Sequence, residues 1–170
     1  EFISKLTTDA SKVLASNESK DEKMLKLINL AEKNVDINGI GMYTLGKYRK
    51  ILSESQIKEY KTLFRKYFLK SFSSRLSEYT DPKINVLSEE VINEKYTIVS
   101  SVLEADEKRP EIKIDWRVYT KNPEKPLVRD LIIEGLSLAR TQREEFNSVI
   151  QNGDGSIEVL FSNLREFIAK

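Results

Sequence analysis

Three short strings in the sequence have the residue types and spacing of known reactive sites. The first, Gly41 to Lys47, has the glycine and lysine spacing of a phosphate-binding P-loop. Tyr48 stands where that loop needs a serine or threonine hydroxyl for magnesium, and no apolar strand precedes the string. We therefore interpret it as the end of a helix at Gly46 rather than as a nucleotide site.

The second string, Gly135 to Ala139, places Ser137 at a predicted strand-to-helix turn, which is the pattern of a nucleophile elbow. The chain contains no histidine and no cysteine, so Ser137 lacks the usual general base and there is no thiolate nucleophile. A serine–lysine arrangement stays open, but Ser137 is better interpreted as a residue of the first turn of a helix. These two absences argue against most hydrolytic enzymes, and no catalytic residue is assigned.

The third string, Asn152 to Gly155, has the small polar residues of a calcium loop. It supplies one carboxylate, Asp154, before Glu158, and it lacks the alternating acidic ligands that calcium needs. A turn between two helices explains the string better. No metal site and no cofactor are expected.

A basic segment runs from Lys47 to Arg75. It holds nine Lys or Arg residues against two Glu residues, a net charge of +7 in a chain whose total is +1. The simplest interpretation is a solvated helix face. The alternative hypothesis is a non-enzymatic α+β interaction module that uses the basic helix 53–79 to bind an acidic protein or nucleic acid, while anionic lipid headgroups are a third class of target. The candidate docking residues are Lys61, Arg65, Lys66, Lys70 and Arg75.

Composition limits the class of protein. At 170 residues, with 39% hydrophobic and 32% charged residues, the chain is typical of a soluble globular protein and is expected to form one domain, 1–170. No apolar run approaches the roughly 20 residues that cross a bilayer. The chain begins at Glu1 rather than at a methionine, so we expect a processed or trimmed form. The lack of cysteine is compatible with an oxidising or a reducing compartment.

Helices are predicted for the first half of the chain. Apolar residues spaced by three and four predict an amphipathic helix over 2–15. Ser19 and Glu22 form a capping-box pattern before a second helix, and a short third helix is expected over 37–45.

The longest predicted helix spans 53–79 and is stopped by Pro82. Ser53 and Gln56 form another capping-box pattern at its start. The apolar stripe of this helix is broad and aromatic, and consists of Ile57, Tyr60, Leu63, Phe64, Tyr67, Phe68, Phe72, Leu76 and Tyr79. Such a stripe is expected to be buried.

After Pro82 the apolar period changes to two, which predicts strands. The first begins at Ile84, bulges at Glu89-Glu90 and ends before a turn at Asn93-Glu94. Two more strands are expected over 96–103 and 112–119, and short polar connections favour an antiparallel meander.

The stretch from Val128 to Phe146 begins as the fourth strand and continues as a helix. Glu134-Gly135 is the joint, because glycine adopts backbone angles that other residues avoid. Gly153 ends this helix, and a last helix begins near Ile157. The predicted fold class is α+β, with N-terminal helices, a four-stranded and mainly antiparallel meander, and C-terminal helices.

Several strings, in their order and spacing, resemble the MlaC family of periplasmic phospholipid-binding proteins, also called toluene-tolerance auxiliary proteins. They are Leu45 to Arg49, Arg75 to Tyr79, and Asp130 to Ser137 leading to Arg143 and Phe146. The resemblance covers nearly the whole chain, and no single string is decisive. Arg49 stands where relatives often carry a tryptophan.

The resemblance implies a soluble periplasmic carrier, with its signal peptide removed, that encloses phospholipid acyl chains in an apolar cavity. It implies that the protein shuttles lipid between an outer-membrane lipoprotein–porin complex and the substrate-binding ring of an inner-membrane ABC transporter. It implies no enzymatic activity and no cofactor, with phospholipid as cargo. A monomer that does not bind nucleic acid is expected.

The cost of exposing hydrocarbon to water sets a requirement for such a cavity. At about 0.8 kcal/mol per methylene, one sixteen-carbon tail represents about 12 kcal/mol of unfavourable water contact, so a carrier must cover its tails almost completely. The aromatic stripe of the long helix and the apolar face of the sheet are the expected walls. The predicted lining residues are Phe64, Tyr67, Phe68, Phe72, Leu76, Val99, Ile114, Trp116, Val118, Leu131, Ile133 and Leu136. Ordinary core packing is the competing interpretation for each of them.

Overall fold

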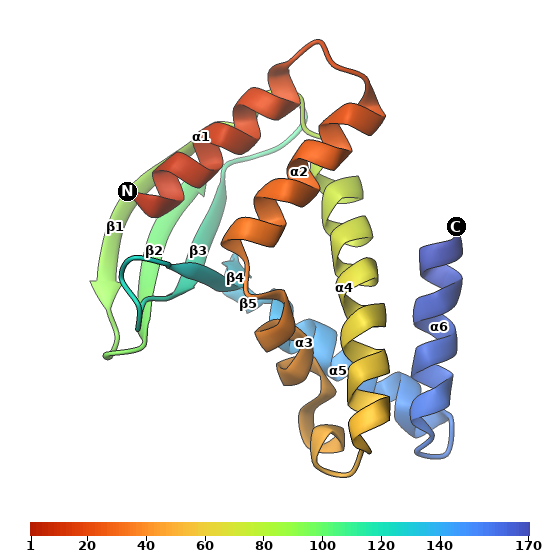
Figure 1. Ribbon diagram of the computed structural model, residues 1–170. Helices are drawn as coiled ribbons and strands as arrows, with labels where there is room; N and C mark the ends of the chain where they lie inside the picture. The colour runs from red at the N-terminus through yellow and green to blue at the C-terminus, as the bar shows by residue number, and fades with distance from the viewer. The chain divides into compact units, whose positions relative to one another are not determined.

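The chain alternates between two units in the computed structural model, which describes all residues from 1 to 170 (Figure 1). The sheet unit comprises residues 1–36 and 73–138, and the helical unit comprises residues 37–72 and 139–170. The organisation as a single domain stays a prediction. None of the helices is long and apolar enough to cross a lipid bilayer.

The sheet unit combines two helices with one antiparallel sheet whose strands follow chain order, β1-β2-β3-β4-β5. Its elements are α1 (Phe2–Ala15), α2 (Lys20–Asn34), β1 (Ile84–Val91), β2 (Tyr96–Leu103), β3 (Ile112–Tyr119), β4 (Leu127–Ile133) and β5 (Leu136–Ser137). The α+β class and the meander are confirmed. The sheet has five strands rather than the predicted four, because β5 has only two residues and depends on pairing with β4.

Helix α1 lies along one face of the sheet (Figure 1). Ile3 of this helix packs with Val99, Val118 and Val128 from three different strands, and all four side chains are buried. The predicted cap of α2 is confirmed in part, because Ser19 Oγ accepts a hydrogen bond from the backbone N–H of Glu22. The predicted helix over 2–15 therefore matches α1, the helix that covers the sheet.

The bulge of β1 lies at Leu87, between Val86 and Ser88, so the prediction of a bulge at Glu89-Glu90 was wrong. Strand β1 is an edge strand, and its residues beyond Val86 are exposed on both faces. Two successive glutamates can therefore point to opposite faces without burying a charge and without a bulge.

The joint at Glu134-Gly135 is a two-residue hairpin turn. Both residues have positive φ, 51° and 81°, and Ile133 pairs with Leu136 across the turn. This geometry matches the tight turn that joins antiparallel strands, for which glycine is favoured. The prediction that the strand passes directly into a helix at Leu136 was therefore wrong. Ser137 lies in β5 and not in the first turn of a helix.

The helical unit contains three whole elements and most of two others. They are α3 (Ile37–Leu45), the 3-10 helix η1 (Gly46–Lys50), α4 (Glu54–Leu76, up to Phe72), α5 (Leu138–Asn152, from Ala139) and α6 (Ile157–Ala169). The capping box at the start of α4 is confirmed. Ser53 Oγ accepts from the N–H of Gln56 at 3.2 Å, and Gln56 Oε1 accepts from the N–H of Ser53 at 2.9 Å.

Helix α4 ends at Leu76, three residues before the predicted end. The N–H of Tyr79 donates to the carbonyl of Leu76, so the backbone tightens into a turn. The ring of Tyr79 lies 4.0 Å from the guanidinium carbon of Arg109, a contact within the sheet unit. Tyr79 therefore packs against a cation of the sheet unit, although its spacing had placed it on the apolar stripe of the helix.

Two of the three strings that have the spacing of known reactive sites have structural roles in the helical unit. The string from Gly41 to Lys47 lies on α3 and η1, and Gly46 has a φ of 58° where the two helices meet. The turn predicted at Asn152 to Gly155 separates α5 from α6. No group of three or more acidic, histidine or cysteine side chains is arranged to hold a metal ion.

The core of the helical unit is aromatic. Tyr60 is fully buried, and its ring stacks on Phe64 at 5.7 Å and on Phe161 at 6.3 Å between ring centroids. The hydroxyl of Tyr60 lies 2.6 Å from Thr44 Oγ1, which itself donates to the carbonyl of Gly41 at 2.7 Å. Because the hydroxyl hydrogen of Thr44 is used in its bond to Gly41, the Tyr60 hydroxyl is the donor to Thr44. Burial raises the pKa of the Tyr60 phenol.

Candidate functional site

The six predicted lining residues on the strands β2, β3 and β4 share one face of the sheet. Val99 pairs with Trp116, Trp116 pairs with Leu131, and Ile114 pairs with Ile133. Residues directly opposite each other in an antiparallel pair point to the same side of the sheet. Together with Val118, which alternates with Trp116, these side chains form a continuous apolar face.

The residues of this apolar face differ in burial. Val99 and Val118 belong to the core under α1, with 7% and 2% of their surfaces exposed. Trp116 and Leu131 pack at the margin of that core and are half-buried, as is Ile133 on β4. The half-buried residues retain accessible apolar surface, so they are the better candidates for contact with a ligand.

A chain of hydrogen bonds fixes the side chain of Trp116. Its Nε1 donates to Ser101 Oγ at 2.9 Å, and Ser101 Oγ donates to the carbonyl of Ile114 at 2.7 Å. Ser101 is fully buried. Ser101 was not predicted, because serine as a residue type does not indicate burial. Its alternation with Val99 and Leu103 was the signal that could have placed it on the apolar face.

Leu136 lies at the margin of the apolar face. Its pairing with Ile133 puts it on the same side of the hairpin, but 60% of its surface is exposed. The neighbouring Ser137 donates its hydroxyl hydrogen to the carboxylate of Asp130, which also accepts from the N–H of Leu131 at 2.8 Å. The hydroxyl of Ser137 thus takes part in a hydrogen bond that holds β5 against β4.

The predicted lining residues of α4 fall into two groups. Phe64, Tyr67, Phe68 and Phe72 lie in the helical unit, whereas Leu76 lies in the sheet unit and is half-buried. Phe64 is only 3% exposed, and Phe68 stacks on both Phe64 and Phe72, at 6.0 Å and 5.7 Å. The structure therefore brings these aromatic rings together along α4, with Phe64 in the core and the others half-buried.

Each unit also contains an open pocket. A pocket of about 260 Å³ in the helical unit is lined by Tyr67, Phe146 and Phe167 together with polar residues such as Gln142 and Glu145. A pocket of about 370 Å³ in the sheet unit lies between α1 and the start of β1, and none of the predicted lining residues borders it. Because both pockets mix apolar and charged walls, the enclosed apolar cavity stays a prediction.

The predicted docking residues of α4 differ in their surroundings. Lys70 is half-buried, and its Nζ donates to the carbonyls of Phe167 and Ile168 at the end of α6. Arg65 is also half-buried, whereas the three others, Lys61, Lys66 and Arg75, are exposed. The basic segment is therefore not one uniform solvated face.

A cluster of aromatic and cationic side chains in the sheet unit was not predicted. The rings of Tyr96 and Tyr119 meet edge to face at 5.6 Å, and the guanidinium of Arg117 lies 4.2 Å from the centre of the Tyr96 ring. Arg129 approaches the same ring at 5.9 Å and forms an ion pair with Asp36 at 3.2 Å. The register of β2 and β3, which pairs Tyr96 with Tyr119, is the signal that could have joined the two rings.

A comparison with curated protein sequences found no match. The solved structure of the phospholipid-binding protein from Ralstonia solanacearum, in complex with a phospholipid, is similar with a TM-score of 0.80. The two chains are 17% identical, and the match covers 99% of this chain and 95% of that chain. A sequence model of the MlaC protein family matches residues 4–166, and this match shows that the chain belongs to the MlaC family.

Proposed function

We propose that this chain is a phospholipid carrier of the periplasm, which holds acyl chains against the apolar face of its sheet. The observation that carries the proposal is the family match over residues 4–166. A structural relative with the same fold is a phospholipid-binding protein in complex with a phospholipid, which supports the same cargo here. The protein acts as a carrier and not as an enzyme.

The apolar face supplies a wall suited to an acyl chain. Trp116, Leu131 and Ile133 are half-buried and lie on one face of the paired strands β3 and β4. Each methylene that leaves water contributes about 0.8 kcal/mol, so binding requires that these side chains and a second wall cover the tail together. The half-buried aromatic residues of α4, Tyr67, Phe68 and Phe72, are also our candidates for contact with acyl chains.

We also propose the route that family membership implies. The carrier would receive or deliver lipid at an outer-membrane lipoprotein–porin complex and at the substrate-binding ring of an inner-membrane ABC transporter. It would act as a monomer, as one domain over residues 1–170 and without a cofactor. Exposed cations such as Lys61, Lys66 and Arg75 are our candidates for contacts with those partners.

The experiment that tests the cargo is organic extraction of the purified protein followed by mass spectrometry of the extract. We expect phospholipid in about one-to-one ratio with protein. Protein that has been unfolded in denaturant, washed free of lipid and refolded is the control, and it should regain phospholipid only after incubation with vesicles. A folded protein that contains no extractable phospholipid, and takes up none from vesicles, would contradict the proposal.

A further inference from the structure

The most exposed large apolar side chain of the molecule is Ile51, of which 73% is accessible to solvent. It directly follows the 3-10 helix η1 of the helical unit, and its N–H donates to the carbonyl of Tyr48 at 3.1 Å. Tyr48 is 7% exposed and anchors the turn in the unit. Ile51 is therefore held outward on a fixed turn.

Three cations precede this side chain in the sequence. Lys47, Arg49 and Lys50 are all exposed, and we call residues 47–51 the basic turn. None of the three forms a salt bridge with an acidic side chain. Lys47 Nζ lies 5.4 Å from the centre of the Tyr48 ring, which orients that cation without neutralising it. The positive charge of the basic turn is thus available to an external anion.

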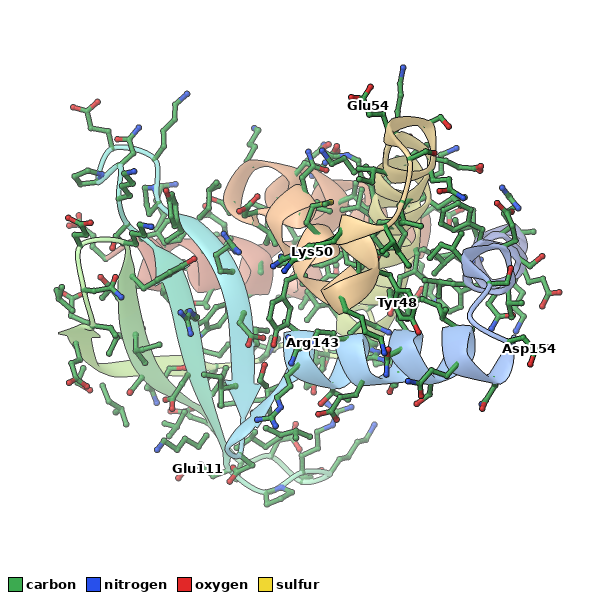
Figure 2. All side chains as sticks on the ribbon, turned by 90° about the horizontal axis from the view of Figure 1, so that it is seen from below. Tyr48, Lys50, Glu54, Glu111, Arg143 and Asp154 are labelled. Atoms are coloured by element: carbon green, nitrogen blue, oxygen red, sulfur yellow. The ribbon has the colours of Figure 1, made fainter.

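Helix α5 brings a fourth cation beside the start of the basic turn. A Cβ atom on Gly46 would lie 3.3 Å from Cδ of Arg143, and the guanidinium of Arg143 lies 4.7 Å from the centre of the Tyr43 ring. Figure 2 labels Lys50, on η1, and Arg143, on α5. Glu54, an acidic residue that follows the basic turn, lies apart from Lys50 in that view.

An exposed isoleucine among cations matches one kind of surface. Anionic headgroups attract Lys and Arg at short range, and the acyl region beneath them removes an apolar side chain from water. An acidic protein surface would neutralise the cations but would provide no apolar region for an outward-pointing side chain without a dedicated pocket. The positive charge of the basic turn, together with its exposed isoleucine, therefore favours a membrane surface over an acidic protein as the partner.

We propose that the basic turn is a membrane-docking surface, which binds the surface of an anionic phospholipid bilayer and inserts Ile51 among the headgroups. The inference goes beyond the carrier function, since it assigns where the protein meets a membrane and not which lipid it carries. With one apolar side chain and a few cations, the contact is weak and reversible. A protein that must leave one membrane to reach another needs such a contact.

Vesicle flotation tests the proposal. The purified protein is mixed with vesicles of phosphatidylcholine alone or of equal parts phosphatidylcholine and phosphatidylglycerol, and the fraction that floats with the vesicles is measured over a salt series. We expect binding to the mixed vesicles only, weakening as salt screens the charges. Flotation reports binding to intact bilayers, whereas lipid extraction reports cargo, so the two proposals can fail separately.

Two variants probe the two components of the surface. Arg49→Ser with Lys50→Ser should weaken binding to the mixed vesicles by about 25-fold, since each cation near an anionic surface contributes about fivefold. Ile51→Ser should weaken binding by about tenfold through the lost apolar contact. The matched controls change exposed residues of α2 in the sheet unit: Lys20→Ser with Lys33→Ser for the charges, and Leu25→Ser for the apolar side chain.

The outcomes separate the possibilities. Both test variants binding less than their controls, with unchanged circular dichroism and unchanged extractable lipid, would support membrane docking. Loss with the charge variant but none with Ile51→Ser would overturn the proposal in favour of an acidic protein partner. Equal binding by wild type and all variants, or no binding of the wild type to mixed vesicles at low salt, would also overturn it.

Discussion

Lys70 Nζ donates a hydrogen bond to the carbonyl of Phe167 at 2.8 Å and lies 5.3 Å from the centre of the Phe167 ring. The carbonyl belongs to the last turn of α6, where it also accepts from the N–H of Lys170 at 3.3 Å and where the helix dipole is negative. A cation predicted as part of a docking face thus stabilises the end of a neighbouring helix in the helical unit.

Lys70→Met is therefore expected to lower the free energy of unfolding by about 1 kcal/mol, because it removes the cation and leaves carbonyls of α6 without this donor. Urea denaturation measures the change. Lys66→Met, an exposed cation on the same helix, is the control and should change stability by less than about 0.5 kcal/mol. Equal stability of the two variants would show that the contact of Lys70 contributes nothing to folding.

Tyr60 predicts how stability depends on pH. Burial raises the pKa of its phenol above the ordinary value of 10.0, so above that pH the unfolded chain loses this proton while the folded chain keeps it. The contribution of Tyr60 to the free energy of unfolding is therefore fully present below pH 10.0, and it falls as the pH rises further. Urea denaturation at pH values on both sides of 10.0 should show a smaller alkaline decline for Tyr60→Phe than for wild type.

The apolar face predicts a loss of cargo when charge is added to it. Ile133→Asp should reduce extractable phospholipid by at least about tenfold, because a carboxylate must be desolvated against hydrocarbon. Leu136→Asp, at the exposed margin, should reduce it less. Leu25→Asp, 63% exposed on α2, is the control and should leave the lipid content unchanged. A folded Ile133→Asp protein with normal lipid content would move the cargo away from this face.

Trp116 gives a direct optical test of the same face, because it is the only tryptophan of the chain. Phospholipids with brominated acyl chains quench indole fluorescence on contact. If Trp116 borders the cargo, loading the protein with brominated lipid should lower its emission relative to loading with the unbrominated lipid. Ile133→Asp should lose most of this quenching together with its lipid. Unchanged emission in a protein shown to contain brominated lipid would place the tails elsewhere.

Local signals in the sequence predicted much of the fold. The pair Ser53 and Gln56 lies three residues apart, and both of its hydrogen bonds form within one helical turn. The bounds of α1 and α3 match the predicted ranges, since apolar spacing and the residue at the helix end are also local features. The residues of β2 and β3 were assigned for the same reason, because alternation repeats every two residues.

Predictions failed where the outcome depended on a distant partner. Gly135 marked a change of direction, but whether the chain then formed a helix or a strand depended on pairing of Leu136 with Ile133. Tyr79 fits the stripe of α4 by spacing, yet it packs beneath Arg109, thirty residues away in the sequence. Local spacing in the sequence does not show which of two distant side chains will meet.

The features of the candidate site fall into the same two groups, those set by local sequence and those set by distant contacts. The sequence by itself determined the α+β class, the lack of histidine and cysteine, and the alternating pattern that puts Trp116 and Val118 on one face. Only the tertiary structure decided that α1 covers Val118, that Trp116 is held by Ser101 and that Lys70 binds the end of α6, 97 residues along the chain. The physical reason is the distance along the chain over which each interaction acts. Backbone hydrogen bonding and side-chain period act over a few residues, whereas burial, pairing and charge neutralisation depend on which segments fold against one another.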